Sequence, residues 1–303
     1  MTENVPVAAT RGWTLRAYSR NNYDFARATR RNRRTIAMTA PGTESASGLT
    51  PSPVREVALA RPFRWLYLGW RDFTHAIVPS ALHGMIAAFG GLAILAFAWG
   101  HFYLLAGAFS GFLLIAPVLA TGLYELSRRL AQGEPPRMRV IFDAWRCSCK
   151  CLLGFGLLLA VVGTFWVGIS SVLIALFVQS PITGLESFIR YVVLSQDSHL
   201  FEIWTALGGL LAALVFAASV VAMPLMLDRD ADLITAVLTS IQAVAANPVA
   251  MALWATIIMA LTALAMGTLF LGLIIVIPVL GHATWHAYID LVDPSSTIPP
   301  RRR

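Results

Sequence analysis

Six apolar runs constrain this chain most strongly, because each is close to the ~20 residues that a helix needs to cross a bilayer core. They cover about residues 76–99, 102–123, 152–178, 201–227, 248–267 and 268–288. A spanning segment in lipid must satisfy its own backbone hydrogen bonds, and a helix does so within one segment. The runs therefore predict an all-α integral membrane bundle of six transmembrane helices within a domain of residues 57–290.

The composition agrees with a membrane protein. The 303 residues are 57% hydrophobic and only 13% charged, whereas about a quarter of the residues in a soluble domain are charged. No nucleotide-binding glycine loop, serine nucleophile elbow or CxxC pair occurs in the sequence. The three cysteines lie together in "CSCKC", a spacing too tight for a disulfide framework. These features favour a non-enzymatic membrane protein over an enzyme.

The distribution of arginines predicts the orientation. Most basic residues lie in residues 1–56, in the segment 124–150 and in the terminal "RRR", whereas the loop 179–200 contains only Arg190. The positive-inside rule therefore places both termini in the cytoplasm. The net charge of +7 favours contact with anionic headgroups of the lipid bilayer, and we expect no nucleic-acid partner because no recognition module is visible.

Both ends of the chain have the composition of tails. Residues 1–56 contain no long apolar run and are rich first in arginine and then in Ser, Pro, Gly and Thr. This composition predicts a disordered N-terminal tail. An alternative start at Met38 would make residues 1–37 a gene-calling extension. Residues 291–303 form a short basic C-terminal tail.

Short amphipathic segments precede the odd-numbered spans. Apolar side chains recur at helical spacing over residues 63–73, 138–145 and 234–245. We expect helices lying in the cytoplasmic interface, although the same pattern would fit helices that extend the spans directly. In the loop 179–200, Thr183 and Glu186 have the spacing of a capping box. A short surface helix is therefore expected on the opposite side of the membrane.

The second helix of each pair contains a proline in a similar setting, namely Pro117, Pro224 and Pro278. This suggests three pseudo-repeated helix hairpins, with each proline kinking its helix. The residues four and eight places after each proline are polar: Thr121 and Glu125, Asp228 and Asp232, His282 and His286. At ~1.5 Å per residue these groups lie at matching depths. They predict a polar cluster at the cytoplasmic ends of the even-numbered helices.

Histidines are the candidate metal ligands. His282 and His286 share one helix face, and His83 lies in the first span, so these three side chains would supply imidazole ligands to a metal or a haem. The competing interpretation places His286 at the interface and lets His282 hydrogen-bond to a neighbouring helix. Under that interpretation no cofactor is expected.

Several phrases of the sequence resemble an uncharacterised bacterial family of multi-pass inner-membrane proteins. They are "LGWRDF", "GLYELSRRLAQGEPP", "DAWR", "PLMLDRDADLITAVLTSIQAVAANP" and "PVLGHATWHAY". The resemblance covers about residues 57–290 and implies six membrane helices and a bacterial inner-membrane location. That family is a domain of unknown function that often carries a cytochrome c oxidase label, and it transfers no catalytic residue to this chain.

Three functions follow as hypotheses. The sequence lacks the His-Pro-Glu-Val-Tyr motif of the main haem-copper subunit, so the resemblance implies an accessory or assembly protein associated with a respiratory complex. The second hypothesis is a haem- or metal-binding redox component that uses His83, His282 or His286. The third is a small-solute transporter or channel gated by the polar cluster, although the span centres lack the charges typical of ion-coupled transporters.

Overall fold

The computed structural model describes residues 53–98, 120–136, 150–180, 184–194, 199–293 and 298, and this part of the chain is helical without a β-strand. Its elements are α2 (Arg61–His75), α3 (Ile77–Ala98), α5 (Thr121–Ala131), α7 (Lys150–Phe177), α8 (Leu185–Phe188), the π-helical turn η1 (Ile189–Val193), α9 (Leu200–Ser219), α10 (Ala222–Asp228), α11 (Leu233–Ala246), α12 (Pro248–Gly267) and α13 (Leu273–Leu291).

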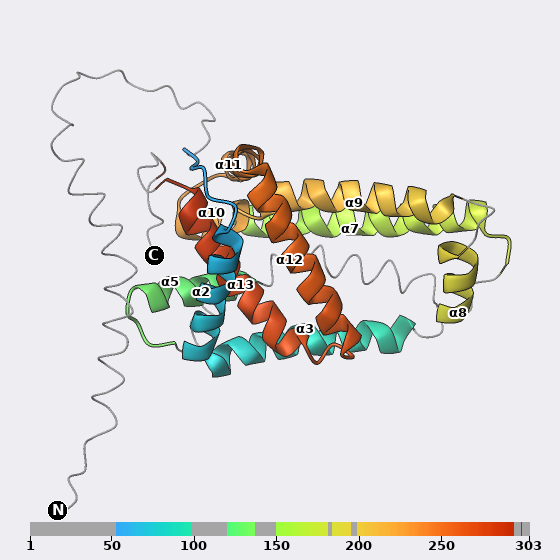
Figure 1. The fold of residues 1–303 in the computed structure, drawn as a ribbon, viewed down its shortest axis with the longest axis horizontal. Helices are drawn as coiled ribbons and strands as arrows, with labels where there is room; N and C mark the ends of the chain where they lie inside the picture. Colours follow the sequence, from blue (N-terminus) through green and yellow to red (C-terminus); the bar gives the residue numbers. More distant parts are fainter. Residues whose placement is uncertain are drawn as a thin grey trace, which may run out of the picture.

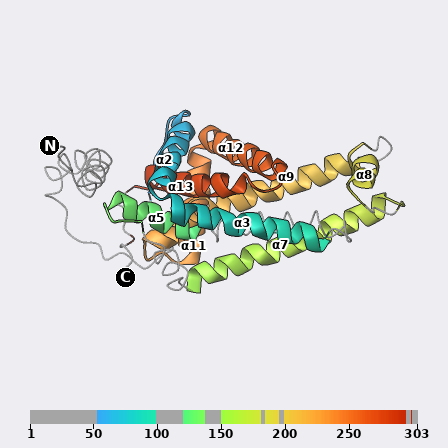
Figure 2. The ribbon, with the colours of Figure 1, turned by 90° about the horizontal axis from the view of Figure 1, so that it is seen from below.

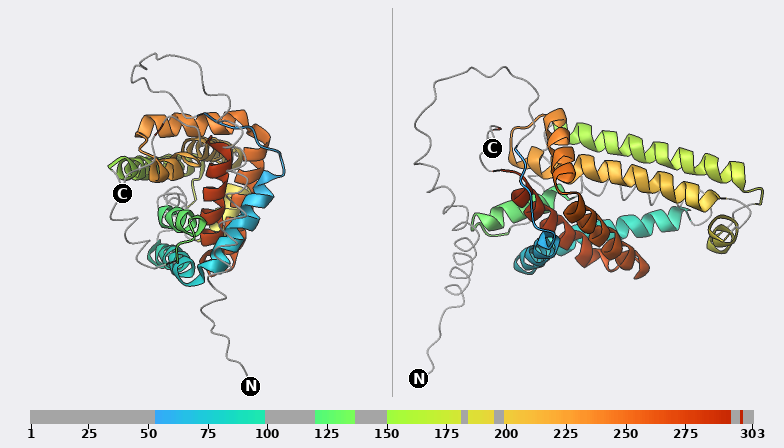
Figure 3. Two further views of the ribbon diagram at one scale, coloured as in Figure 1. Left: turned by 90° about the vertical axis from the view of Figure 1, so that its left-hand side faces the viewer. Right: turned by 45° about the horizontal axis from the view of Figure 1, so that its top comes forward.

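The long helices α3, α7 and α9 run along the molecule, whereas α12 and α13 cross it obliquely and shorter helices lie across its two ends (Figure 1). α7 and α9 form an antiparallel pair, and α13 packs against α2, α3, α5 and α12. α8 lies across one end, whereas α2, α5 and α11 gather at the other (Figure 2). The end-on view shows α11 running across the ends of α7 and α9 (Figure 3).

Five segments are long and apolar enough to cross a membrane: Ile77–Ala96, Gly154–Phe177, Leu200–Asp228, Pro248–Gly267 and Leu273–Leu291. They correspond to the first, third, fourth, fifth and sixth predicted spans. The second predicted span, 102–123, lies almost entirely outside the described residues, and its last residues belong to α5. The all-α membrane bundle is therefore confirmed, while the count of six spans stays a prediction.

The buried core lies at the end where α2 crosses the bundle. Trp65 from α2, Met226 from α10, Trp254 from α12 and Tyr288 from α13 pack in one cluster. By contrast, large apolar side chains project outward from the spanning helices, and Phe165 on α7 is 69% exposed. An apolar outer surface around an apolar core suits a bundle whose outer surface contacts lipid.

The amphipathic segments are separate helices rather than extensions of the spans. α2 and α3 are divided at Ala76 (φ −130°, ψ 42°), and α11 and α12 are divided at Asn247 (φ −132°, ψ 50°). The second break is fixed by the Asn247 side chain, which accepts a hydrogen bond from Val57 N at 2.7 Å. The first and third predicted repeat units thus share one backbone bend, and the segment 138–145 of the second unit lies outside the described residues.

The prolines shape their helices in two different ways. Pro224 lies in α10 and has no N–H for the carbonyl of Val220, where the chain breaks between α9 and α10. Pro278 instead lies inside an unbroken α13. It leaves the carbonyl of Ile274 without its helical donor, and Gly84 of α3 packs so closely there that a Cβ would come within 2.4 Å of that oxygen. Pro117 lies outside the described residues.

The remaining connections agree with the sequence in part. A short helix does occur in the loop 179–200, as α8 and η1, although Thr183 of the expected capping box lies outside the described residues. The turn between α12 and α13 places Leu269 and Phe270 at positive φ, 52° and 65°. At the other end of the chain, Pro53 O accepts a hydrogen bond from Asp293 N at 2.9 Å. Part of the predicted tail, residues 53–56, therefore runs beside the end of α13.

Candidate functional site

A buried chain of polar side chains joins four helices beside α13. Its members are Asp72 from α2, Ser80 from α3, Ser127 from α5, and His282 and His286 from α13. Asp72, Ser80, Ser127 and His282 are completely buried, and His286 is 8% exposed. Polar groups buried this completely are expensive unless they form hydrogen bonds with one another.

Each neighbouring pair in this chain lies at hydrogen-bond distance. His286 Nε2 is 2.9 Å from Asp72 Oδ2, and Ser127 Oγ is 2.7 Å from the same carboxylate oxygen. Ser127 Oγ is also 2.7 Å from His282 Nδ1. On the other side of the ring, His282 Nε2 is 2.9 Å from Ser80 Oγ. The result is an unbroken path from α3 to the far turn of α13.

The donors and acceptors along the path can be assigned in one consistent direction. Ser127 has a single hydroxyl proton and donates it to Asp72, so Ser127 must accept a hydrogen bond from His282 Nδ1. A neutral His282 then has an unprotonated Nε2, which accepts from Ser80. His286 Nε2 donates to the same Asp72 oxygen. All four bonds therefore point toward the Asp72 carboxylate.

Close helix packing brings Asp72 to α13. Gly69 lies one turn before Asp72 on α2 and rests directly on the backbone of α13. A Cβ at Gly69 would come within 2.5 Å of Val279 O and 2.7 Å of Ala283 N. The absent side chain therefore lets α2 approach closely enough for Asp72 to reach His286, which lies one turn beyond Ala283.

A second buried carboxylate lies on α5 beside this chain. Glu125 is completely buried and accepts hydrogen bonds from Arg128 Nε and Nη2 and from Arg129 Nε, each at 2.8 Å. The hydrogen bond that Arg128 donates to Glu125 is the largest cause that raises the pKa of Arg128, and the charge of Asp228 raises it further. Two guanidinium groups thus compensate the burial of one carboxylate.

A third polar contact joins α10 to α13. Tyr288 donates to Asp228 Oδ2 at 2.8 Å, and Arg229 Nε lies 3.8 Å from the same oxygen. Asp228 also acts electrostatically on Arg128 of α5. The groups on α5, α10 and α13 therefore adjoin one another.

The structure gathers most of the residues expected in the polar cluster, although in three adjoining groups. His282 and His286 lie in the polar chain that ends on Asp72. Glu125 pairs with the two arginines of α5, and Asp228 accepts a hydrogen bond from Tyr288. Thr121 is buried in the first turn of α5. Asp232 lies elsewhere, where it caps α11 through Thr235 N at 2.9 Å.

The expected metal ligands do not form a ligand group in the described part of the chain, where no set of three or more His, Cys, Asp or Glu side chains is arranged to hold a metal ion. Both ring nitrogens of His282 lie at hydrogen-bond distance from serine hydroxyls. His83 is buried one turn beyond Ser80 on α3. At His282, a haem or metal would have to replace one of the serine contacts, and a cofactor in this protein stays an untested prediction.

Several members of the chain were missed by sequence reasoning. The pattern over residues 63–73 predicts an interfacial helix and gives Asp72 no buried role, and isolated serines such as Ser80 and Ser127 form no pattern of their own. The available signal was an acidic residue within "GWRDF", a segment otherwise rich in aromatic side chains. Its burial could not be inferred without the position of α13.

The chemistry available to this chain is proton exchange. Ser80, His282, Ser127 and Asp72 resemble a hydroxyl nucleophile, a base and an orienting acid, with one extra hydroxyl in the series. However, Ser80 and His282 are completely buried, so a substrate carbonyl does not reach the hydroxyl in this conformation. Imidazole and carboxylate groups in a continuous hydrogen-bonded path can instead pass or store a proton.

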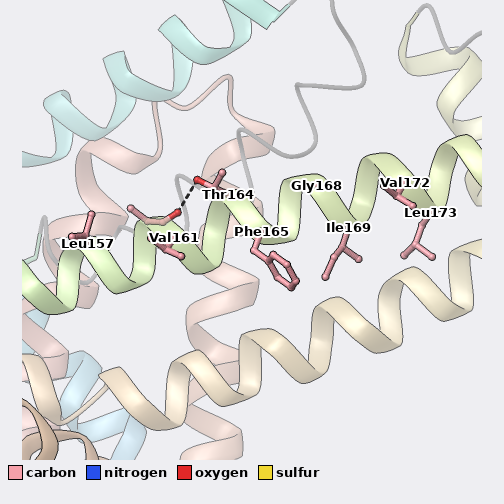
Figure 4. Close-up of a pocket in the computed structure, with 9 residues that line it drawn as sticks. Leu157, Val161, Thr164, Phe165, Gly168, Ile169, Val172 and Leu173 are labelled. Atoms are coloured by element: carbon pink, nitrogen blue, oxygen red, sulfur yellow. Dashed lines mark hydrogen bonds between the residues drawn. The ribbon is translucent and has the colours of Figure 1, made fainter.

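An open apolar groove of about 800 Å³ lies apart from the polar chain, along α7. Leu157, Val161, Phe165 and Ile169 line part of it, and Thr164 turns its hydroxyl back to Ala160 O at 2.9 Å (Figure 4). The groove contains none of the titratable groups described above. It therefore belongs to the apolar surface of the bundle.

Comparison with known proteins gives a family match in the middle of the chain. Residues 104–228 match DUF2189, a family described as a predicted integral membrane protein. This match includes "GLYELSRRLAQGEPP" and "DAWR" but neither "LGWRDF" nor "PVLGHATWHAY". No curated protein and no solved structure matches the chain. The DUF2189 match and the five apolar helices agree in indicating an integral membrane protein, and the function of the matched family is unknown.

Proposed function

We propose that this integral membrane protein is a proton-coupled transporter or channel for a small solute. The observation that carries the proposal is the continuous hydrogen-bonded path that ends on the buried Asp72 carboxylate. An ionisable group within a membrane domain marks an ion or substrate pathway more often than a packing site. The acid is supplied by α2, beside the ends of the spans, so the path does not require a charge at a span centre.

The proposal includes an orientation. The arginine-rich end, where α2 and α5 lie beside the polar groups, would face the cytoplasm of a bacterium, and α8 would face the other side of the inner membrane. The support for this orientation is the positive-inside rule applied to the basic segments of the sequence. The polar path would then lie near the cytoplasmic end of the bundle.

Proton exchange can be tested without knowledge of the solute. Purified protein in proteoliposomes is placed on a solid-supported membrane, and the outer solution is changed from about pH 7.5 to about pH 5.5, which brackets the ordinary pKa of histidine, about 6.5. The wild type is expected to give a transient charge displacement. Asp72→Asn preserves the shape of the side chain and should abolish the current.

The matched control is Asp290→Asn. Asp290 also joins α13 to α2, since Trp65 Nε1 donates to it at 2.8 Å, but it lies outside the polar path. Its current should therefore equal that of the wild type. A wild-type signal no larger than that of empty liposomes, or equal currents in the wild type and in Asp72→Asn, would refute the proposal.

An accessory or assembly role near a respiratory complex stays a prediction from the sequence resemblance. No contact among the described residues supports this role. Isolation of the protein from native membranes in a mild detergent is the direct measurement, and stable recovery with respiratory subunits would support it.

A further inference from the structure

The two sides of α7 differ in what the described part of the chain packs against them. On the inner side, which meets α9, α10 and α11, Phe155 and Trp166 are almost completely buried, and Trp166 stacks on Trp204 of α9. The opposite side carries the open groove of about 800 Å³, and every residue that lines it belongs to α7 itself (Figure 4). Val161 and Phe165 in this groove are 58% and 69% exposed.

The middle of the groove is a notch of small side chains. At about 100° per residue, Val161, Thr164 and Gly168 fall within a sector of about 60° on α7. A Cβ at Gly168 would meet nothing within 4 Å in the described part of the chain. Thr164 needs no further polar partner, because its hydroxyl bonds back to Ala160 O at 2.9 Å. Small residues of this kind let a second membrane helix approach closely.

The path of the chain requires a segment that returns along α3. This helix is 22 residues long, so its last residue, Ala98, lies about 33 Å from its first. The chain nevertheless comes back to the start of α3, because Ala76 packs in one cluster with Leu126 of α5. Residues 99–119, which lie between the two described parts, must therefore cover that length in the opposite direction, and as a helix they would extend about 32 Å.

The sequence of this connecting segment suits the notch on α7. Residues 99–119 read WGHFYLLAGAFSGFLLIAPVL and contain no Asp, Glu, Lys or Arg, so a helix is the form in which they can lie in lipid. Gly107 and Gly111 are four residues apart and share one helix face. This is the spacing at which glycines allow close contact between membrane helices.

The two pairs of small residues also lie at matching levels. Ala120, at the start of α5, and Phe155, in the second turn of α7, belong to one buried cluster. Counting back from Ala120 places Gly111 about 14 Å away along a helix, and counting forward from Phe155 places Thr164 about 14 Å away. One turn further, Gly107 and Gly168 correspond in the same way.

We propose that residues 99–119 form a membrane helix that runs antiparallel to α7 and fills its groove, with Gly107 and Gly111 against Gly168 and Thr164. The extent of the DUF2189 match supports α7 as the main contact. Residues 104–228 include most of the connecting segment together with α5, α7, α9 and α10, but neither α3 nor α13. The groove is then an internal contact of the bundle rather than a surface for lipid or for a second copy of the chain.

Disulfide crosslinking in the full chain tests this placement. The three native cysteines are replaced by serine, and a protease site is inserted at Gly133, in the turn that follows α5. Gly111→Cys is combined with Thr164→Cys, and Gly107→Cys with Gly168→Cys, since a disulfide requires Cα atoms about 4.4–6.8 Å apart. After oxidation in lipid vesicles and cleavage, a disulfide within one chain keeps the two fragments together on a non-reducing gel. At least one pair is expected to give joined fragments.

The matched control combines Gly111→Cys with Leu210→Cys. Leu210 is also an exposed residue within a span, 60% exposed on α9, but it lies outside the groove. It should give several-fold less joined product. A crosslinked species of twice the mass of the chain would place a second copy in the groove, and joined fragments no more abundant than in the control for both pairs would leave the groove to lipid. Either result overturns the proposal.

A second measurement does not depend on disulfide geometry. Gly168→Leu should lower the midpoint of unfolding in sodium dodecyl sulfate, because the new side chain would push the connecting helix out of the notch. Gly209→Leu is its control, since Gly209 on α9 also has open space around its Cα. This control should unfold at the wild-type midpoint. Equal midpoints for the two variants would contradict an occupied groove.

Discussion

Ser127→Ala removes the central link of the polar path. The hydroxyl is completely buried and lies 2.7 Å from both Asp72 Oδ2 and His282 Nδ1. Loss of a hydrogen bond to a charged group costs ~1.5–3 kcal/mol, and a donor left without an acceptor costs a further ~1–3 kcal/mol. Interhelical hydrogen bonds in membrane proteins average only ~0.6 kcal/mol, which argues for the lower part of the summed range. We therefore expect a total loss of about 2–4 kcal/mol in the free energy of unfolding.

Ser170→Ala supplies the comparison. Ser170 is also buried and links two helices, but it accepts one bond, from the neutral Trp204 Nε1 at 3.0 Å. Its loss is expected to cost about 0.6 kcal/mol. Both variants would be unfolded reversibly with sodium dodecyl sulfate in mixed micelles, with helicity followed by circular dichroism.

A double-mutant cycle with Asp72→Asn isolates the contact of Ser127 with the carboxylate. Residues in one hydrogen-bonded network typically show a coupling of about 0.5–3 kcal/mol, and a value in the upper half of that range is expected because Asp72 is charged. If Ser127→Ala costs no more than Ser170→Ala, and the effects of Ser127→Ala and Asp72→Asn simply add, the polar path is not a coupled network and the reasoning fails.

Three further predictions concern packing, capping and burial. Gly69→Ala should cost about 1–3 kcal/mol by forcing α2 away from Val279, whereas Gly154→Ala, with open space around its Cα, should be neutral or stabilising; the same unfolding assay separates them. Asp232→Ala should cost about 1 kcal/mol at neutral pH. Hydrogen bonds from Thr235 lower the pKa of Asp232, so this contribution is present above the usual Asp range and is lost as pH falls through the lowered pKa; unfolding midpoints of both proteins should converge in acid. Trp254→Phe should cost less than an ordinary core substitution, because the Nε1 group of Trp254 is buried without a hydrogen-bond partner among the described residues; a loss above about 3 kcal/mol would contradict this.

Length and hydropathy were sufficient to predict the membrane class and five spans. A helix in lipid must be apolar over a fixed length, so Pro248–Gly267 could be delimited to the residue. The helix bend at Asn247 could not be predicted, because it depends on the contact of its side chain with Val57, 190 positions away. Long-range contacts of this kind leave no periodic signal.

The candidate site was predicted only on α13. The proline spacing led to His282 and His286, since both follow from one helical repeat within a single segment. Their partners come from α2, α3 and α5, and each is an isolated polar residue in its own segment. The assembly of such residues depends on the packing order of the helices, which a single sequence without contacts does not specify.

Helix α2 shows why the direction of its amphipathic pattern was hard to interpret. In a soluble protein the apolar stripe of a helix marks the buried side, which would bury Phe63, Tyr67 and Trp70. Here those rings face outward, and the buried side contains Gly69 and Asp72. In lipid the outside of the bundle is as apolar as its core, so small and polar residues mark the helix contacts instead. By this rule, the glycine and the aspartate of "GWRDF" indicate the face of α2 that packs against α13.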